Sequence, residues 1–338
     1  MKKIINFMLL CSITLLAVFG LEINVSTLDT SLSNLSNDAK CSNVSKLSSE
    51  PEWLDSVDEP TNFDYSFAVV GDIQNVTFKY PEKVSTIYDY IVNNIENKKI
   101  AHVFSLGDLT EGDSPGEWKT VKKAISKLDG NVTYSLVRGN HDGKKGFLEC
   151  FGNSSEYRKQ YKSSFLSSLN TVVEFSVGNL DYLVINLDYA PSDEVLEWAN
   201  SVVEAHPYHN VIVTSHNCLD PNGNRNDENI QGNGGTAMWD KFISKHSNIV
   251  LGLYGHYDDE YLTVVKSEGE KGNIVSEILI DPQKTDLLYD GGVGIVAFLY
   301  FSNGGRNVEF RYYSTIRNQY YRPENQFSFE INVIERNS

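Results

Sequence analysis

The chain has 338 residues, of which 41% are hydrophobic, so it is long enough to bury a large core in one or two domains. Its formal net charge is -16. This charge repels polyanions at long range, which argues against a nucleic-acid partner and against an anionic membrane surface. We therefore expect a small substrate, or one that is held by local contacts.

The first 64 residues are predicted to lie outside the folded domain. Residues 1–20 combine two early lysines, an apolar run from Ile4 to Phe19 and a small residue at the end, which is typical of a secretory signal peptide. The run is shorter than the roughly 20 residues of a membrane-spanning helix, so no stable membrane insertion is expected. Residues 21–64 are rich in Ser, Asn and Asp without a sustained period, which predicts an exposed leader. We expect a secreted, extracellular protein.

Glycosylation sequons and cysteines fit that location. The sequons suit a glycoprotein and lie at Asn24, Asn34, Asn43, Asn75, Asn131 and Asn153. Once Cys11 leaves with the signal peptide, Cys41, Cys150 and Cys218 remain. An odd count predicts one disulfide and one free thiol, with the pairing left open.

Strands and helices are predicted to alternate from residue 65 onward. Short apolar runs predict strands over 65–70, 102–106, 134–137, 182–187, 211–214 and 249–253. Helical spacing predicts helices over 81–97, 118–128, 192–204 and 238–244. The alternation indicates a layered α/β domain, which we assign to residues 65–338.

The pattern changes after Gly272, where only strands are predicted. They cover 274–280, 293–301 and 308–314, and the last two are joined by a hairpin turn at 302–305. These strands predict a second sheet that packs on the first.

Five short segments carry metal-binding side chains directly after predicted strands. They are Gly71-Asp72-Ile73-Gln74, Gly107-Asp108, Gly139-Asn140-His141-Asp142, Ser215-His216-Asn217 and Gly255-His256-Tyr257-Asp258. Side chains at the carboxyl ends of strands point into the ligand crevice of an α/β protein. Glycine beside the donor, in all but the fourth segment, is expected to let the backbone turn sharply. Any one segment alone is no more than a turn signal, but together they predict a metal site.

In this order, the segments resemble the D-x-H or D-x-Q, GD, GNH, lone His and GHxH pattern of the calcineurin-like metallophosphoesterase superfamily. The resemblance runs from about Phe67 to the C-terminus and is closest to a secreted branch with D-x-Q in the first segment. It implies an α/β fold, a four-layer α/β/β/α sandwich of two mixed sheets flanked by helices. It also implies a phosphoesterase that hydrolyses a phosphomonoester or phosphodiester in a small phosphorylated substrate, through a hydroxide that bridges two metal ions.

The resemblance assigns metal ligands residue by residue. Asp108 would bridge both ions, and Asn140, His216 and His256 would complete a site that suits manganese, iron or zinc. The other site would use Asp72 with Asp108, and with Gln74 and Asp258 where the family usually has histidine. Gln74 either ligates or only hydrogen-bonds a carboxylate, and Asp258 either ligates or belongs to an exposed acidic loop. If both ligate, the site has only oxygen donors, which favours magnesium, manganese, calcium or ferric iron.

Other residues near the segments are candidates for catalysis or support. His141 resembles the family's histidine that protonates the leaving oxygen, and Asp142 is expected to orient its ring. Asp281 and Gln283 either add hydrogen bonds near the ions or only shape a turn, and Arg138 either attracts phosphate or is ordinary surface. The alternative function is a catalytically weak or inactive secreted metal-binding protein that keeps the fold. The oligomeric state is left open.

Overall fold

The computed structural model describes residues 53–228, 230–257 and 260–336, all within one structural unit. Several predictions fall on other residues and lie outside this described part. They concern the signal peptide, residues 21–52 of the leader, Cys41, Asp258 and the sequons at Asn24, Asn34 and Asn43.

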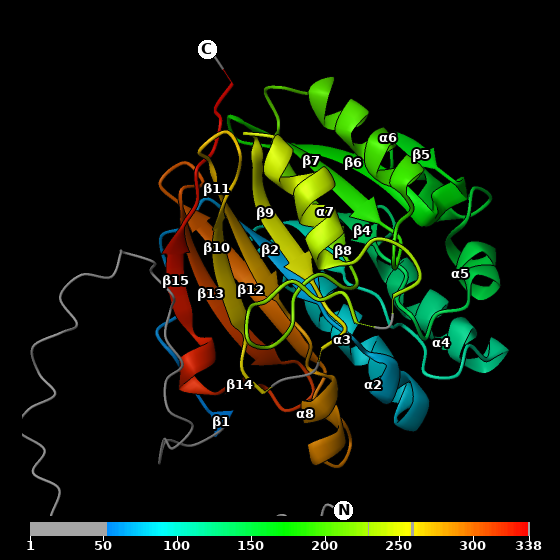
Figure 1. Cartoon of the computed structure of the whole chain (residues 1–338). Coiled ribbons are helices and arrows are strands. Elements are labelled where there is room, and N and C mark those ends of the chain that lie inside the picture. Colours follow the sequence, from blue (N-terminus) through cyan, green and yellow to red (C-terminus); the bar gives the residue numbers. More distant parts are fainter. Residues whose placement is uncertain (1–52, 229, 258–259, 337–338) are drawn as a thin grey trace, which may run out of the picture. The chain divides into compact units, whose positions relative to one another are not determined.

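Two mixed sheets form the centre of the fold (Figure 1). The first sheet has the order β1 (Trp53–Leu54), β14 (Gln319–Tyr321), β13 (Asn307–Ser314), β12 (Ile295–Ser302), β2 (Tyr65–Val70), β3 (Ile100–Ser105) and β4 (Thr133–Leu136), with β15 (Phe327–Glu330) on β13. The second has the order β10 (Thr263–Glu268), β11 (Ile274–Leu279), β9 (Ile249–Tyr254), β8 (Asn210–Ser215), β7 (Leu180–Leu187), β6 (Asn170–Val177) and β5 (Ser163–Phe165).

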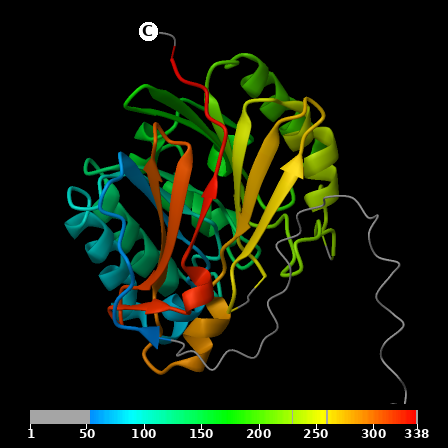
Figure 2. The ribbon, with the colours of Figure 1, turned by 90° about the vertical axis from the view of Figure 1, so that its left-hand side faces the viewer.

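Helices cover the outer faces of both sheets. Figure 2 shows the sheets in the middle, with blue and cyan helices on one side and green and yellow helices on the other. The helices are α2 (Gln74–Lys79), α3 (Pro81–Asn93), α4 (Pro115–Ile125), α5 (Lys144–Phe151), α6 (Asp193–Glu204), α7 (Gly235–Lys241) and α8 (Gln283–Leu288). Short 3-10 turns lie at Ser126–Leu128, Glu156–Lys159, Ser167–Leu169, Ile243–Lys245 and Pro323–Asn325. The predicted α/β fold with two mixed sheets flanked by helices is confirmed.

The main hydrophobic core lies between the two sheets and continues on the other face of the first sheet, under α3 and α4. Its buried residues come from strands of both, for example Phe67 and Val69 of β2 facing the layer that includes Tyr182 and Val184 of β7. The hydroxyls of Tyr65 and Tyr182 share a hydrogen bond of 2.5 Å, so the one polar contact of this tyrosine pair is satisfied inside the core. A second core lies between the other face of the second sheet and the helices α6 and α7.

The C-terminal strands do not form a sheet of their own, as the sequence had suggested. Strand β12 pairs antiparallel with β2 and with β13, so it extends the first sheet. Strand β11 pairs parallel with β9 in the second sheet. The composition of a strand shows that it is buried but not which neighbour it pairs with, so the prediction of a separate sheet was wrong. The predicted hairpin is confirmed, with Ser302 opposite Asn307.

The domain begins before residue 65. Strand β1 pairs with β14, and the rings of Trp53 and Tyr321 lie 4.7 Å apart. Phe63 packs edge-on against Tyr300, and the guanidinium of Arg311 donates to the carbonyl of Asp58. The predicted leader boundary at residue 64 is therefore too late, because isolated aromatic anchors in a polar segment carry no periodic signal.

Sequons and cysteines of the described part can be placed. Asn75 lies in α2, is only 7% exposed and donates from Nδ2 to the carbonyl of Gln283, so it offers no glycan site in the folded protein. Asn131 and Asn153 are exposed. Cys150 and Cys218 are both buried free thiols, so the predicted disulfide does not join them.

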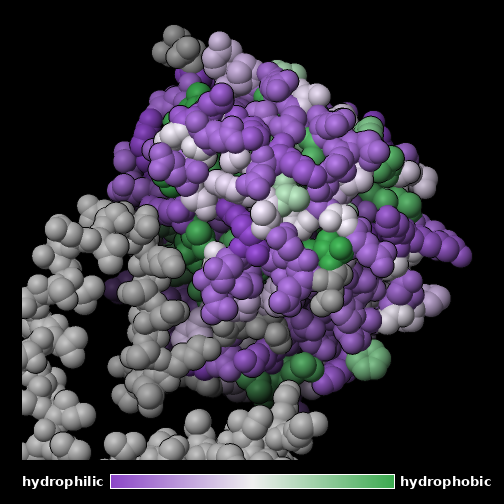
Figure 3. All heavy atoms as spheres, in the orientation of Figure 1, coloured by the Kyte–Doolittle hydropathy of each residue, from purple (hydrophilic) through white to green (hydrophobic). Residues whose placement is uncertain are grey.

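The face in Figure 3 is mostly hydrophilic, with hydrophobic residues in separate small patches. Of the described residues, the large hydrophobic side chains that remain exposed are Phe78, Leu166, Tyr208, Leu287 and Leu288. No helix in the described part is long and apolar enough to cross a membrane.

Candidate metal centre

All five metal-binding segments start at carboxyl ends of parallel strands. Asp72, Asp108 and Asn140 follow β2, β3 and β4, which are parallel neighbours in the first sheet. His216 and His256 follow β8 and β9, which are parallel neighbours in the second sheet. Each sheet therefore delivers its donors to one edge, and the two edges meet.

Asp108 lies at the centre of this meeting point. Its Oδ2 is 3.3 Å from Nε2 of His216 and also accepts a hydrogen bond of 3.1 Å from Nε2 of Gln74. Its Oδ1 accepts the backbone N–H of His141 at 2.9 Å. Burial alone would raise the pKa of Asp108, but the charge and hydrogen bond of His216 outweigh burial and lower it. Asp108 is thus placed to bridge groups from both sheets.

His216 is fixed so that one ring nitrogen faces the carboxylates. Its Nδ1 donates to the carbonyl of Leu106 at 2.8 Å, which leaves Nε2 directed into the centre. Nε2 lies 2.9 Å from Oδ1 of Asn140 and 3.9 Å from Oδ2 of Asp72. An imidazole held by a carbonyl at one nitrogen, with oxygens around the other, has the arrangement of a metal-bound histidine.

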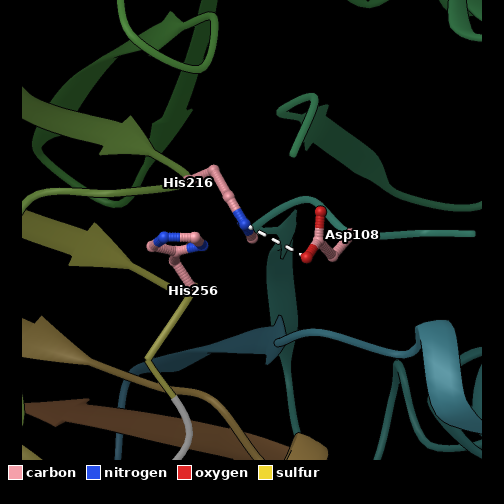
Figure 4. Close-up of side chains that lie close together, drawn as sticks. All are labelled: Asp108, His216 and His256. Atoms are coloured by element: carbon pink, nitrogen blue, oxygen red, sulfur yellow. Dashed lines mark ion pairs between the residues drawn. The ribbon is translucent and has the colours of Figure 1, made fainter. Parts of the chain in front are cut away.

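The third side chain of the group is His256 (Figure 4). One ligand atom each from Asp108, His216 and His256 lie within 4.8 Å of one another. Burial and the neighbouring His216 lower the pKa of His256 to about 4, so its ring is neutral and keeps a lone pair for a cation. His256 and Asp108 also have left-handed backbones, with φ of 81° and 45°, a strained conformation that is common at functional sites.

Most glycines beside these donors are needed because a side chain would not fit there, and not because the backbone turns sharply. A Cβ on Gly139 would lie 2.0 Å from Oδ1 of Asp108, and a Cβ on Gly255 would lie 2.3 Å from Oδ1 of Asp72. Only Gly107, with φ of 98°, needs a glycine for its backbone conformation as the sequence had suggested. The glycines therefore let two carboxylates approach the neighbouring loops.

The second half of the centre holds buried oxygens without partners. Asp72 is fully buried, and its Oδ2 accepts the backbone N–H of His256 at 3.0 Å. Its Oδ1 and the Oε1 of Gln74 have no hydrogen-bond partner among the described residues. Burial, and then the charges of Asp281 and Asp108, raise the pKa of Asp72. Buried carboxylate and amide oxygens in this state fit a bound cation, because each would otherwise stay uncompensated.

One of the two options for Gln74 is seen in this geometry, because its amide nitrogen hydrogen-bonds Asp108. Its amide oxygen has no partner among the described residues, so ligation by Gln74 stays a prediction. Asp258, the other candidate ligand of this half-site, lies outside the described residues. The donor set of the described residues fits two ions that share Asp108.

The prediction that Asp142 orients the ring of His141 was wrong. The carboxylate of Asp142 accepts the backbone N–H groups of Leu109, Thr110 and Gly139, and the hydroxyl of Thr110, at distances of 2.9–3.1 Å. Burial, and then the charge of Asp108, raise the pKa of Asp142 to about 6 despite these donors. Asp142 therefore joins the second and third segments to each other and does not touch the imidazole.

Glu111 lies against His141 instead. Nδ1 of His141 donates to the carbonyl of Glu111 at 3.1 Å and lies 3.4 Å from its Oε2. Burial would lower the pKa of His141, but the Glu111 carbonyl and the charges of Asp108 and Glu111 outweigh it and raise the pKa. The Glu111 loop is held by Glu117 of α4, whose Oε1 accepts the N–H groups of Glu111 and Gly112. The sequence analysis did not single out Glu111, and the one signal for it was an acidic residue three positions after Asp108.

Arg138 is not the ordinary surface residue that one of its two predicted roles required. It is 7% exposed, and its Nε donates to Oδ1 of Asp188 at 2.6 Å. Its Nη1 donates to the carbonyls of Gly139 and Asp142. These contacts of Nε and Nη1 hold the third segment in shape.

Tyr189 is a further residue that the sequence did not single out. It follows β7, and its half-buried ring lies 5.8 Å from the ring of His216 and 5.6 Å from that of His256. The aromatic ring covers one side of both imidazoles. No motif contains it, so only the fold could identify it.

Comparison with known proteins agrees with this geometry. Residues 65–274 match the family described as calcineurin-like phosphoesterase. The chain belongs to this family. Calcineurin-like phosphoesterases are metal-dependent phosphoric ester hydrolases with two metal ions, so the family part of the sequence-based resemblance is confirmed.

Individual relatives are distant. The uncharacterized protein YvnB of Bacillus subtilis (strain 168) is 25% identical over 292 residues, which cover 80% of this chain and 22% of YvnB. The chain thus spans about a fifth of the length of this relative. Similar solved structures include GAP50, the anchor in the inner membrane complex of Plasmodium (14% identity, 80% and 90% of the two chains, TM-score 0.49). Purple acid phosphatase PPD1 from yellow lupin is another (13% identity, 79% and 53%, TM-score 0.49).

Proposed function

We propose that the protein is a secreted, metal-dependent phosphoesterase of small phosphorylated substrates, of the branch with D-x-Q in its first segment. The observation that carries the catalytic part is the position of Asp108, whose two oxygens contact Gln74, His141 and His216 from both sheets. Secretion is supported only by the sequence of residues 1–20 and by the exposed sequons at Asn131 and Asn153.

The chain's own residues have distinct parts in this reaction. When bound, two divalent ions hold the phosphoryl oxygens and activate the attacking water. Asn140, His216 and His256 would hold one of them, Asp72 and Gln74 the other, and Asp108 both. His141 donates from Nδ1 to Glu111, so its Nε2 is the nitrogen that can pass a proton to the leaving oxygen.

A cavity of about 510 Å³ beside the centre supports a small substrate. Its lining includes Tyr257, the residue after His256, together with Asp220, Asp227, Glu228 and Arg225. The guanidinium of Arg225 is paired with Glu277, so the three carboxylates leave the lining acidic, and we propose that the group leaving with the phosphate ester oxygen is neutral or cationic. A monoester and a diester both fit this description.

The catalytic proposal is tested with purified protein loaded separately with manganese, iron, zinc, magnesium or calcium. Aryl phosphomonoesters and phosphodiesters should be hydrolysed with at least one metal. Asp108→Ala and Asn140→Ala should each lower kcat/KM at least about 100-fold. Asp89→Ala, which removes an exposed carboxylate paired with Lys127, is the control and should leave kcat/KM unchanged.

Two results would count against this proposal. Hydrolysis that survives both site substitutions would reject the assigned centre. Two bound ions without hydrolysis in any metal form would favour the alternative of a catalytically inactive metal-binding protein.

The leaving-group proposal needs a pair of aryl phosphates that differ only in the charge of a ring substituent. The ester with a trimethylammonium group should have the higher kcat/KM, and the ester with a sulfonate group the lower. Glu228→Gln combined with Asp227→Asn should bring the kcat/KM values of the two esters closer together. If the ratio of these kcat/KM values is unchanged in the double variant, the cavity does not bind the leaving group.

A further inference from the structure

Asp281 occupies a position equivalent to those of the metal-binding segments. Strand β11 is parallel to β9, with Leu279 opposite Tyr254. Its carboxyl end therefore lies at the same edge of the second sheet. Asp281 is the second residue after β11, as His256 is the second after β9 and Asp72 the second after β2.

The loop of Asp281 is pressed against the loop of Asp72. A Cβ on Gly71 would lie 2.7 Å from the carbonyl oxygen of Ile280 and 2.7 Å from Cδ of Pro282. The backbone of Ile280 also donates to the carbonyl of Tyr254, directly before the fifth segment. Asp281 thus follows a residue fixed between the first and fifth segments.

The carboxyl groups of Asp72 and Asp281 interact with each other and are 0% and 3% exposed. Asp281 accepts the backbone N–H of Gln283 at 2.8 Å, which fixes the orientation of its carboxylate. Two carboxyl groups that interact out of water need either a shared proton or a bound cation. The Oε1 of Gln74 has no partner among the described residues, and it adds a neutral oxygen donor that a cation can use.

We propose that Asp281 is a further ligand of the ion held by Asp72, so that this half-site is completed by a sixth strand end. Carboxylate and amide oxygens from Asp72, Gln74, Asp108 and Asp281 form a donor set for a hard divalent cation such as Mn²⁺, Mg²⁺ or Ca²⁺. This inference rests on the proposed metal-dependent function but concerns binding, which can be measured without turnover.

The test is metal binding to the chelator-treated full chain, followed by titration with Mn²⁺ and counting of bound ions after equilibrium dialysis. The wild type should bind two ions per chain. Asp281→Asn should keep one tight ion and raise the Kd of the other at least about tenfold. Asp286→Asn is the matched control, because Asp286 is equally buried but bonds Val293 and Gly294, and it should bind both ions like the wild type.

Two ions bound to Asp281→Asn with wild-type Kd values would overturn the inference, and so would a wild type that binds fewer than two. If Asp281→Asn does not fold, anomalous diffraction from wild-type crystals grown with Mn²⁺ decides. A manganese peak within about 2.6 Å of the Asp281 carboxylate supports ligation, and two peaks beyond that distance reject it. A wild type that binds two ions but hydrolyses no ester would refute the proposed function and leave the role of Asp281 standing.

Discussion

Two acidic residues near the centre have separable tasks. Glu111 contacts the imidazole of His141, whereas Asp142 holds the loops on either side of Asp108. Neither is placed to bind an ion in the described geometry. Substitution of Glu111 should therefore change kcat, whereas substitution of Asp142 should change the free energy of unfolding.

Glu111→Ala should lower kcat by about 10- to 100-fold while KM changes less than about threefold, because only proton transfer through His141 is affected. Glu111→Gln should recover part of the loss, since its amide oxygen can lie beside Nδ1 of His141 where the carboxylate oxygen now lies, although without its charge. Glu149→Ala, an exposed glutamate paired with Lys145, serves as control. Steady-state kinetics that show the loss only in KM would contradict the positioning role.

Asp142→Asn should lower the free energy of unfolding by about 2–4 kcal/mol. Asparagine keeps one acceptor oxygen and turns its NH₂ toward backbone N–H donors that Asp142 now satisfies. Chemical denaturation measures the change, with Asp89→Asn as a surface control. A variant that is inactive but as stable as the wild type would show that Asp142 takes part in the reaction itself.

Most of the centre was predictable residue by residue because strand ends and donors coincide along the chain. Asp72, Asp108, Asn140 and His216 meet as the resemblance implied. The distant contacts of Asp142 with Leu109 and Thr110, and of Arg138 with Asp188, could not be read from the sequence, because only the fold brings these loops together. Tyr189 follows a predicted strand but belongs to none of the five segments, so no pattern pointed to it.

At the scale of single elements, α8 connects Asp281 to the first sheet. Its residue Asp286 is buried and accepts the N–H groups of Val293 and Gly294 just before β12. Burial raises the pKa of Asp286 to about 7, which these two donors only partly offset. The sequence after Gly272 predicts strands alone. It does not predict α8, because the six residues of this helix are too few to show a helical period.

The raised pKa of Asp286 predicts a pH-dependent stability. The folded state holds its proton more tightly than the unfolded state, so this contribution is complete below about pH 4 and is lost as pH rises to about 7. Asp286→Asn removes the ionisation, so it should gain stability relative to the wild type between pH 5 and pH 8. Urea unfolding at both values tests this, and a difference between variant and wild type that does not change with pH would contradict it.

At the scale of the whole molecule, the layers were predictable but the division of strands between sheets was not. Alternating strands and helices specify an α/β domain, whereas the pairing of β12 with β2 depends on contacts between distant parts of the chain. The family match ends at residue 274, but the first sheet continues through β12–β15. The domain therefore extends beyond the part that defines the family.

Truncation after residue 291 should abolish folding, because it removes β12–β15 and leaves one edge of β2 unpaired over a buried core. We expect aggregation and loss of the cooperative thermal transition. Truncation after residue 331 is the control, since it removes only the end segment, in which Ile334 hydrogen-bonds Asn210. A shorter product that remains monomeric and melts cooperatively would show that β2–β11 form an independent domain.

The insertion of β12 between β2 and β13 also orders events during synthesis. Strand β2, which carries Asp72, leaves the ribosome early, but its neighbour β12 emerges only after the whole second sheet. Until then the strand keeps an open edge, and a nascent chain in this state depends on chaperones or on rapid elongation to avoid aggregation. His256, the last donor of the five segments in the described part, follows β9, so we expect both ions to be captured only after the strands up to β9 have been made.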